Sequence, residues 1–371
     1  MRNLGLDIIR FFAVLLVVGH HYNFSTFTNW IFKAWIVGGW VGVDLFFVIS
    51  GYLISSLLFR EYQNSGTVNL KRFLIRRGFK IYPPFWLLTL VSVIIFSATK
   101  QKRTGSEIIT ELLFIQNYLP GVWLFTWSLA IEEHFYLGLA LLFKILKSID
   151  ITKSIKFIPI ICVSICVLVL FMRFRQIINV EHYFYFMYHF RTDLRIDALC
   201  FGVLISYLVY FKNLQQTVER IPAKIPVLVG LLMLLPAFIY PRETDRWVLI
   251  WGLTIFYIGS ALIVLGASKL NNSTSKLLNF LGSLGAASYS IYLWHMPVRI
   301  WFLPLLIKTT QLSNPAFSFG VYVFSTFIIG WIMHLLVEKP VLALRDYFYK
   351  DATNELPVGV NLKFSPGSGV G

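Results

Sequence analysis

The chain contains ten stretches of about 20 largely apolar residues, the length that a helix needs to cross the hydrocarbon core of a membrane. Only 14% of its 371 residues are charged, against about 25% in soluble domains, which excludes two water-soluble domains. A hydrophobic content of 57% also excludes a disordered chain. The composition therefore predicts an all-α fold, a polytopic membrane helix bundle with about ten transmembrane helices. The predicted spans are 6–24, 36–59, 81–98, 123–147, 156–172, 195–211, 225–240, 247–267, 286–307 and 316–337.

The basic residues predict how these spans are oriented. With the N-terminus inside, 20 of the 33 lysines and arginines fall in cytoplasmic loops and tails, which favours an N-in, C-in topology. The net charge of +15 is explained by these loops, so no nucleic-acid partner is predicted, whereas membrane lipids are. One transmembrane domain should cover 1–350, and 351–371 should be a flexible tail that could derive from an expression vector.

Two further segments and the cysteines complete the outline. Residues 108–120 are too short to span and fit a re-entrant segment, whereas the aromatic residues of 181–191 fit the membrane interface. The three cysteines lie in apolar stretches and are odd in number, so we expect buried thiols with neither a disulfide framework nor zinc. They are Cys162, Cys166 and Cys200.

Ionisable residues inside an apolar helix are costly and are functional candidates by default. In the first span, Arg10 and His21 are separated by eleven positions, which places them only about 20° apart around a helix and about 16 Å apart along it. Asp7 lies on the same face, and His20 points about 100° away from His21. A histidine can take a proton from a hydroxyl or carry an acyl group, so His21 is the leading candidate, with His20 as its rival and a hydrogen-bonded core histidine as the structural alternative.

The second and third spans carry the next candidates. Asp44 lies among glycines at 38, 39, 42 and 51, which allow close helix approach, so it is either functional or a buried partner of an arginine. Arg72, Arg76, Arg77 and Lys80 crowd before the third span. They are either positive-inside anchors or a phosphate clamp, since arginine forks match phosphate oxygens.

The fourth span reads WSLAIEEHFYL, in which three polar residues, 132–134, cannot all face one side. Ser128, Glu132 and Tyr136 are each one turn apart and form a candidate polar lining. His295 and Glu338 are additional candidates. Arg191, Asp193, Arg195 and Asp197 are predicted to form a salt-bridge cluster among themselves. There is no zinc-protease, nucleotide-loop or nucleophile-elbow motif, so no metal is predicted.

In this order, these motifs resemble the membrane-bound acyltransferase-3 family over about residues 4–345. They are the Arg10–x10–His21 pair, GWVGVDLFFVISGYLI, RR-x-x-K-I-Y-P, WSLAIEEHFYL, RIDAL-x-x-G, SYSIYLWH and VEKP. The resemblance implies a bundle of about ten helices that moves acyl groups, usually acetyl, from cytoplasmic acyl-CoA to bacterial cell-surface saccharides such as lipopolysaccharide. It also implies an inner-membrane location. Relatives often carry an extracytoplasmic hydrolase-like domain, and a stand-alone membrane form is expected here.

Carried over residue by residue, the resemblance implies that His21 is catalytic, with Arg10 as its motif partner. Arg76, Arg77 and Lys80 would bind the phosphates of acetyl-CoA, and Glu132 matches the first glutamate of the WSL motif. Lys80 departs from the family, which has a second arginine there, and lysine lacks the bidentate fork. Glu132 or Asp44 is expected to orient His21. Ser128, Tyr136, Arg195, Asp197 and His295 are substrate-binding or structural candidates.

Two other functions fit the same residues. A transporter would use the intramembrane charges as an ion or proton relay, and a non-catalytic partner in polysaccharide export would tolerate loss of Arg10 and His21. The acceptor is expected to be a lipid-linked or surface saccharide. Aromatic rings at 182–190 could stack on its sugars, or could equally form an interface belt.

Overall fold

The computed structural model describes residues 3–22, 30–181, 184–310 and 314–349, and all regular elements in these ranges are helical. The predicted all-α fold is therefore confirmed. The first half contains α1 (Leu4–His20), α2 (Trp30–Gly38), η1 (Gly39–Val41), α3 (Gly42–Ser65), α4 (Leu70–Ala98), α5 (Gly105–Leu112), η2 (Leu124–Thr126), α6 (Trp127–Ile149), α7 (Ile151–Ser154), η3 (Ile155–Phe157) and α8 (Ile158–Ile177). The predicted tail, 351–371, lies outside the described residues.

The second half continues the bundle, and three short π-helical segments, η5 to η7, interrupt or extend its helices. Its elements are α9 (Tyr185–His189), η4 (Thr192–Leu194), α10 (Asp197–Phe211), α11 (Leu214–Arg220), α12 (Lys224–Leu234), α13 (Pro236–Ile239), η5 (Val248–Gly252), α14 (Leu253–Ala267), α15 (Lys276–Ala286), α16 (Ser288–Pro297), η6 (Val298–Phe302), α17 (Leu303–Thr310), α18 (Pro315–Met333), η7 (His334–Glu338) and α19 (Lys339–Phe348). Within the described residues, each of the ten predicted spans coincides with one of these helices or helical runs, and residues 23–24 of the first span lie outside the described part.

By length and apolar composition, six helical stretches of the described chain can cross a membrane. The remaining predicted spans fall short of that criterion. α1 has 17 residues, α10 and α12–α13 are shorter apolar helices, and α6 carries Glu132 and Glu133. A polytopic membrane protein is therefore supported, while the count of ten and the N-in, C-in topology stay predictions. The six stretches are Trp30–Ser65, Leu70–Ala98, Ile151–Ile177, Val248–Ala267, Ser288–Thr309 and Pro315–Phe348.

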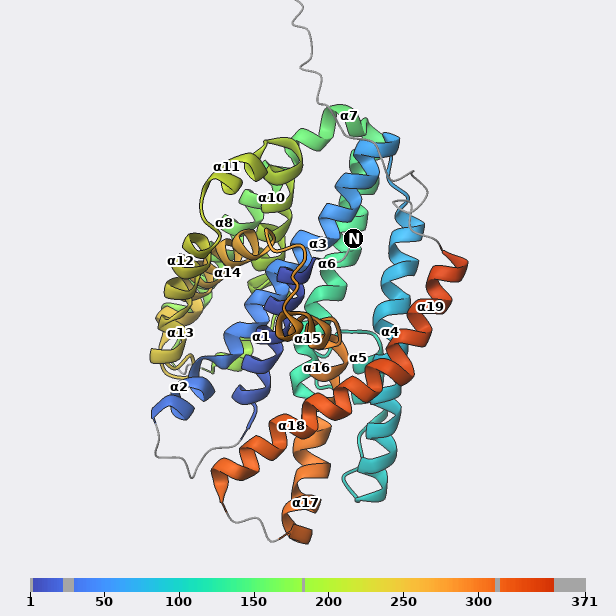
Figure 1. Ribbon diagram of the computed structural model, residues 1–371, viewed down its shortest axis with the longest axis vertical. Helices are drawn as coiled ribbons and strands as arrows, with labels where there is room; N and C mark the ends of the chain where they lie inside the picture. The colour runs from blue at the N-terminus through green and yellow to red at the C-terminus, as the bar shows by residue number, and fades with distance from the viewer. Residues whose placement is uncertain (1–2, 23–29, 182–183, 311–313, 350–371) are drawn as a thin grey trace, which may run out of the picture.

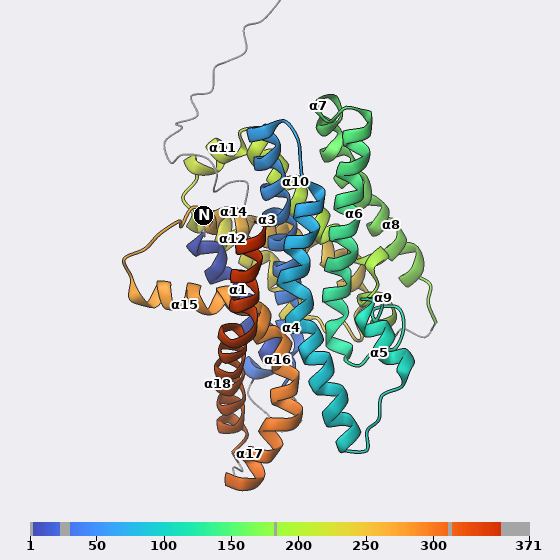
Figure 2. The ribbon, with the colours of Figure 1, turned by 90° about the vertical axis from the view of Figure 1, so that its right-hand side faces the viewer.

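The elongated bundle has two ends with different loops. The turn between α3 and α4, together with α7 and α11, lies toward the upper end in Figure 1, and the ends of α4 and α17 lie at the lower end. The upper loops are the ones that the basic residues predict to be cytoplasmic. Figure 2 shows α15 projecting sideways from the bundle, roughly across its long axis.

Glycines bring the central helices into close contact, as predicted for the second span. A Cβ on Gly42 would lie 2.4 Å from the carbonyl oxygen of Ala13, and one on Gly51 would lie 2.1 Å from that of Leu199. α3 therefore packs against α1 and α10 at backbone distance, which only glycine permits. The three cysteines are buried, as expected.

Both ambiguous segments contain side chains that are buried in the protein. Residues 108–120 form the end of α5 and a loop, where the buried carboxylate of Glu111 accepts hydrogen bonds from Thr126 and from the backbone of Val122. In 181–191, residues 182–183 lie outside the described part, but His189 and Phe190 are buried against Trp127. The last residues of this segment therefore pack into the protein, and its position at the membrane interface stays a prediction.

Candidate active site

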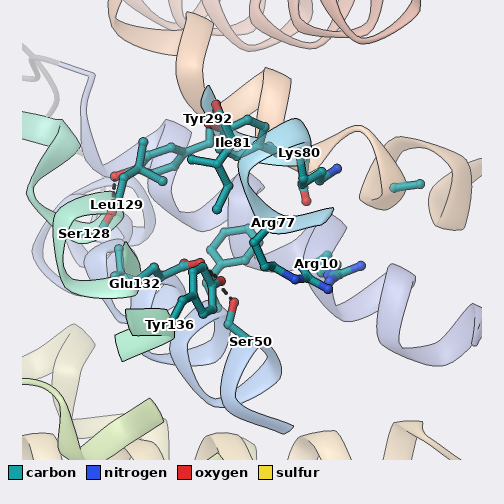
Figure 3. Close-up of a pocket in the computed structure, with 15 residues that line it drawn as sticks. Arg10, Ser50, Arg77, Lys80, Ile81, Ser128, Leu129, Glu132, Tyr136 and Tyr292 are labelled. Carbon is teal, nitrogen blue, oxygen red and sulfur yellow. Dashed lines mark hydrogen bonds between the residues drawn. The ribbon is translucent and has the colours of Figure 1, made fainter. Parts of the chain in front are cut away.

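A cavity opens between α1, α3, α4, α6 and α16, and the side chains predicted to carry chemistry form much of its wall (Figure 3). Arg10, Arg77 and Lys80 gather on one side of it, and Ser128 and Glu132 lie opposite. The polar lining residues are Arg10, Ser50, Arg77, Lys80, Ser128, Glu132, Tyr136, Ser288, Tyr289 and Tyr292.

The three cations of the cavity differ in how far their charges are compensated. Arg10 pairs with Asp7 at 3.3 Å, one turn away on α1. Lys80 pairs with the buried Glu338, which also accepts a hydrogen bond from Ser290. Within the described residues Arg77 makes no ion pair or hydrogen bond, so its guanidinium is the cation best able to take up an anion.

Arg76 does not share this cavity. Its guanidinium lies 3.1 Å from Asp346 on α19 and donates to the carbonyl oxygen of Tyr349. Consecutive helical residues point about 100° apart, so Arg76 and Arg77 face different neighbours. The predicted trio of Arg76, Arg77 and Lys80 is thus divided, with Arg77 and Lys80 in the cavity and Arg76 against α19.

The polar stripe on α6 lines the cavity as its spacing predicts. The Glu132 carboxylate accepts hydrogen bonds from Tyr136 at 2.5 Å and from Ser50 at 3.3 Å. Ser128 shares a hydrogen bond of 2.7 Å with the hydroxyl of Tyr292. Because the three residues are four positions apart on α6, Ser128, Glu132 and Tyr136 all face the same cavity.

The two residues after Glu132 point away from the cavity. Glu133 accepts a hydrogen bond from Tyr82 at 2.9 Å, and His134 pairs with the hydroxyl of Thr192 at 2.7 Å. The three adjacent polar residues therefore diverge, as predicted.

His21 lies beyond the cavity, at the C-cap of α1. Its Nδ1 lies 2.9 Å from the carbonyl oxygen of Val17, and its ring centroid is 4.8 Å from that of His295 and 5.0 Å from that of His20. The His295 centroid is in turn 5.4 Å from that of Tyr292, a wall residue of the cavity. Tyr292 and His295 therefore stand between the cavity and His21.

Neither carboxylate expected to orient His21 contacts it. Glu132 binds Tyr136 and Ser50, and Asp44 forms a buried ion pair with Arg195 at 3.0 Å. The expectation that Glu132 or Asp44 orients His21 is not met in this structure, because both carboxylates are held by other partners.

The predicted salt-bridge cluster around residue 195 forms only in part. Arg191 pairs with Asp193 at 2.6 Å. Arg195 binds Asp44 on α3, and Asp197 binds Arg173 on α8 at 2.8 Å. The prediction that all four residues pair among themselves is therefore wrong, because the last two have partners on other helices.

Sequence reasoning missed Arg242, which joins His20 to His189 through hydrogen bonds. Its guanidinium donates to Nε2 of His189 at 2.9 Å and to Nε2 of His20 at 3.0 Å. It also lies over the rings of Trp40 and Tyr185. Arg242 stands in the charged loop PRETDR, so its sequence context resembles a solvated turn and carries no signal of burial. Among the described residues, no three His, Cys, Asp or Glu side chains come together to hold a metal ion.

Comparison with known proteins shows which family and which relatives this chain resembles. The sequence pattern of the acyltransferase-3 family, described as an acyltransferase domain, matches residues 3–335. A Staphylococcus aureus (strain COL) protein named a putative O-acetyltransferase is 32% identical over 91% of this chain and 56% of its own length. The peptidoglycan O-acetyltransferase OatA of Listeria monocytogenes is 28% identical over 91% of this chain and 55% of its own length.

The chain thus spans a little over half the length of these curated relatives. No solved structure matches it significantly. The family pattern covers nearly all of the described helices and includes all the lining residues of the cavity, from Arg10 to Tyr292. The chain therefore belongs to the acyltransferase-3 family.

Proposed function

We propose that the chain is a membrane O-acetyltransferase that moves an acetyl group from cytoplasmic acetyl-CoA to a hydroxyl of a cell-envelope saccharide. Family membership supports acyl transfer, and the relatives' names support O-acetylation. One observation carries the proposal in this chain. Arg77, which makes no ion pair or hydrogen bond within the described residues, faces a cavity whose wall leads, through Tyr292 and His295, to His21.

The cationic side of the cavity suits the phosphates of the donor. Arg77 offers a planar guanidinium whose paired N–H groups match phosphate oxygens. Arg10 and Lys80 add positive charge, although Asp7 and Glu338 compensate part of it. The cavity opens beside α4, whose N-terminus lies at the end of the bundle where the predicted cytoplasmic loops gather.

His21 carries the transfer step in this proposal. A main-chain carbonyl can only accept a hydrogen bond, so the Nδ1 of His21 beside the Val17 carbonyl oxygen carries the hydrogen. Its Nε2 then bears a lone pair. That nitrogen can take the proton of an acceptor hydroxyl as a general base, or can carry the acetyl group itself.

The acceptor in this proposal is a cell-wall saccharide. The relatives from Listeria monocytogenes and Bacillus subtilis are named for peptidoglycan, and the names of these relatives do not mention lipopolysaccharide. A peptidoglycan or related lipid-linked saccharide is therefore the acceptor to test first.

The direct test supplies membranes containing the protein with acetyl-CoA labelled in the acetyl group. The proposal predicts that free CoA thiol and labelled, alkali-sensitive glycan appear together, and mass spectrometry of the glycan locates the ester. A transporter or a non-catalytic export partner would leave the thioester intact. Equal CoA release in membranes with and without the protein would therefore reject the proposal.

A further inference from the structure

Three histidines from two helices meet beyond the cavity, and each has one ring nitrogen next to a main-chain carbonyl oxygen. The Nδ1 atoms of His20, His21 and His295 pair with the carbonyl oxygens of Ile36, Val17 and Tyr292, respectively. Because a carbonyl oxygen only accepts, each Nδ1 carries the hydrogen. In all three neutral rings, the Nε2 atom is therefore the one with the lone pair.

The three Nε2 atoms have different surroundings. That of His20 accepts a hydrogen bond from Arg242 at 3.0 Å and is therefore occupied. His295 is fully buried, and its Nε2 has no hydrogen-bond partner within the described residues. A buried acceptor without a donor is unfavourable and calls for an explanation in function.

Among the described aromatic rings that contact His295, one can become a donor. The ring of Phe125, with its centroid 4.8 Å away, has no polar hydrogen, and the hydroxyl of Tyr292 is engaged with Ser128 and with the carbonyl oxygen of Phe125. The ring centroid of His21 is also 4.8 Å away. His21 gains a second N–H as soon as its Nε2 takes up a proton.

We infer that His295 is a positioning residue for His21. During acetyl transfer, Nε2 of His295 accepts a hydrogen bond from the Nε2–H of protonated His21. Among the described residues no carboxylate hydrogen-bonds to either ring, and each Nδ1 pairs with a main-chain carbonyl oxygen. His295 would supply the stabilisation that a carboxylate gives a catalytic histidine elsewhere.

This inference rests on the proposed function in its general-base form. The acceptor oxygen forms a bond to the acetyl carbon, and the carbon–sulfur bond of the thioester breaks. The hydroxyl proton moves to Nε2 of His21 and ends on the leaving sulfur as the CoA thiol. His295 holds the Nε2–H of His21 between these two events, and no further reactant is consumed.

Two substitutions separate this role from a structural one. In His295→Asn, the amide nitrogen can still donate to the Tyr292 carbonyl, but the Nε2 position is empty. In His295→Gln, the amide reaches the Nε2 position, while the bond to the Tyr292 carbonyl is lost. If His295 acts only through its bond to the Tyr292 carbonyl, kcat should be higher in His295→Asn than in His295→Gln. If His295 acts through Nε2, kcat should be higher in His295→Gln.

The measurement is the kcat for acetyl transfer from acetyl-CoA, per amount of folded protein, across pH. We expect kcat of His295→Asn to fall by about 100-fold, the usual contribution of acid–base assistance, and kcat of His295→Gln to fall less. The acidic limb of the pH profile should move to lower pH in His295→Asn, because protonated His21 has lost its acceptor. His134→Asn is the matched control, since His134 binds Thr192 through Nδ1 outside this group, and it should behave as wild type.

The inference is overturned if the Asn variant transfers as well as the Gln variant, or if kcat falls equally at every pH. Failure of the proposed function looks different. In that case the wild-type protein itself releases no CoA from acetyl-CoA, and the histidine variants match it.

Discussion

Asp44 on α3 and Arg195, which precedes α10, form an ion pair of 3.0 Å in which each side chain is only 1% exposed. A second buried pair, Arg173 with Asp197 at 2.8 Å, joins α8 to α10. The Arg195 guanidinium also lies over the ring of Trp127, the first residue of α6. These contacts connect four helices, so the structure favours a structural role for Asp44 over a catalytic one.

Single replacement of either partner should therefore destabilise the protein. Asp44→Leu or Arg195→Met leaves one buried charge without a partner, which costs about 3–5 kcal/mol. The double variant removes both charges and should recover much of that loss. Thermal unfolding in detergent measures the effect. A double variant that folds stably but transfers no acetyl group would instead return Asp44 or Arg195 to the catalytic site.

Arg77 and Arg76 form a matched pair for testing donor binding. Arg77→Gln should raise KM for acetyl-CoA by roughly 10- to 100-fold, because a charge-assisted hydrogen bond contributes about 1.5–3 kcal/mol. Arg77→Lys should have a KM between those of the wild type and Arg77→Gln, since lysine keeps the positive charge but lacks the bidentate guanidinium. Arg76→Gln breaks contacts to Asp346 and Tyr349 outside the cavity and should leave KM unchanged. A larger KM effect at Arg76 than at Arg77 would move the phosphate site out of the cavity.

Replacement of the two adjacent glutamates of α6 should affect kcat to different extents. Glu132→Gln removes the charge that holds Tyr136 and Ser50 on the cavity wall, so kcat should fall by roughly 10- to 100-fold as the geometry loosens. KM for acetyl-CoA should not rise, because one negative charge has left the cavity that is proposed to bind the phosphates. Glu133→Gln, at a residue held by Tyr82 away from the cavity, should change kcat far less. Steady-state kinetics of the two variants decide between these outcomes, and equal losses of kcat would argue against a special place for Glu132.

The close approach of α3 and α10 predicts a stability difference between two glycines. A Cβ on Gly202 would lie 2.5 Å from the carbonyl oxygen of Val48, so Gly202→Ala should destabilise the protein by about 1–3 kcal/mol. Gly138 on α6 has nothing within 4 Å of a Cβ, and Gly138→Ala should stabilise its helix by about 0.5–1 kcal/mol. Melting temperatures in detergent compare the two. Similar shifts for both would contradict the packing described.

Much of the fold could be predicted because the membrane imposes a single pattern. Long apolar runs must be helical to satisfy their backbone groups, and each of the predicted runs coincides with helix. The polar stripe of Ser128, Glu132 and Tyr136 was predictable for a similar reason, since a spacing of four places residues on one face of a helix.

The contacts between distant segments could not be predicted from local pattern. Spacing shows that Arg76 and Arg77 face different sides of α4, but not that Arg76 meets α19 while Arg77 lines the cavity. Arg242 reaches His20 from 222 residues away. Spacing predicts one face for Arg10 and His21, but of these two residues only Arg10 lines the cavity, and His21 lies at the C-cap of α1. The helix face on which a residue lies can be derived from spacing, whereas the residue that it contacts depends on how the helices pack.

The central claim is that Nε2 of His21 carries the transfer, and acetyl transfer by His21→Ala membranes tests it most directly. Labelled acetyl-CoA is supplied to equal amounts of wild type, His21→Ala and His20→Gln, the last of which keeps an acceptor for Arg242. We expect His21→Ala to lose transfer to the glycan completely and His20→Gln to retain most of it. Wild-type transfer by His21→Ala, with normal protein in the membrane, would contradict the account.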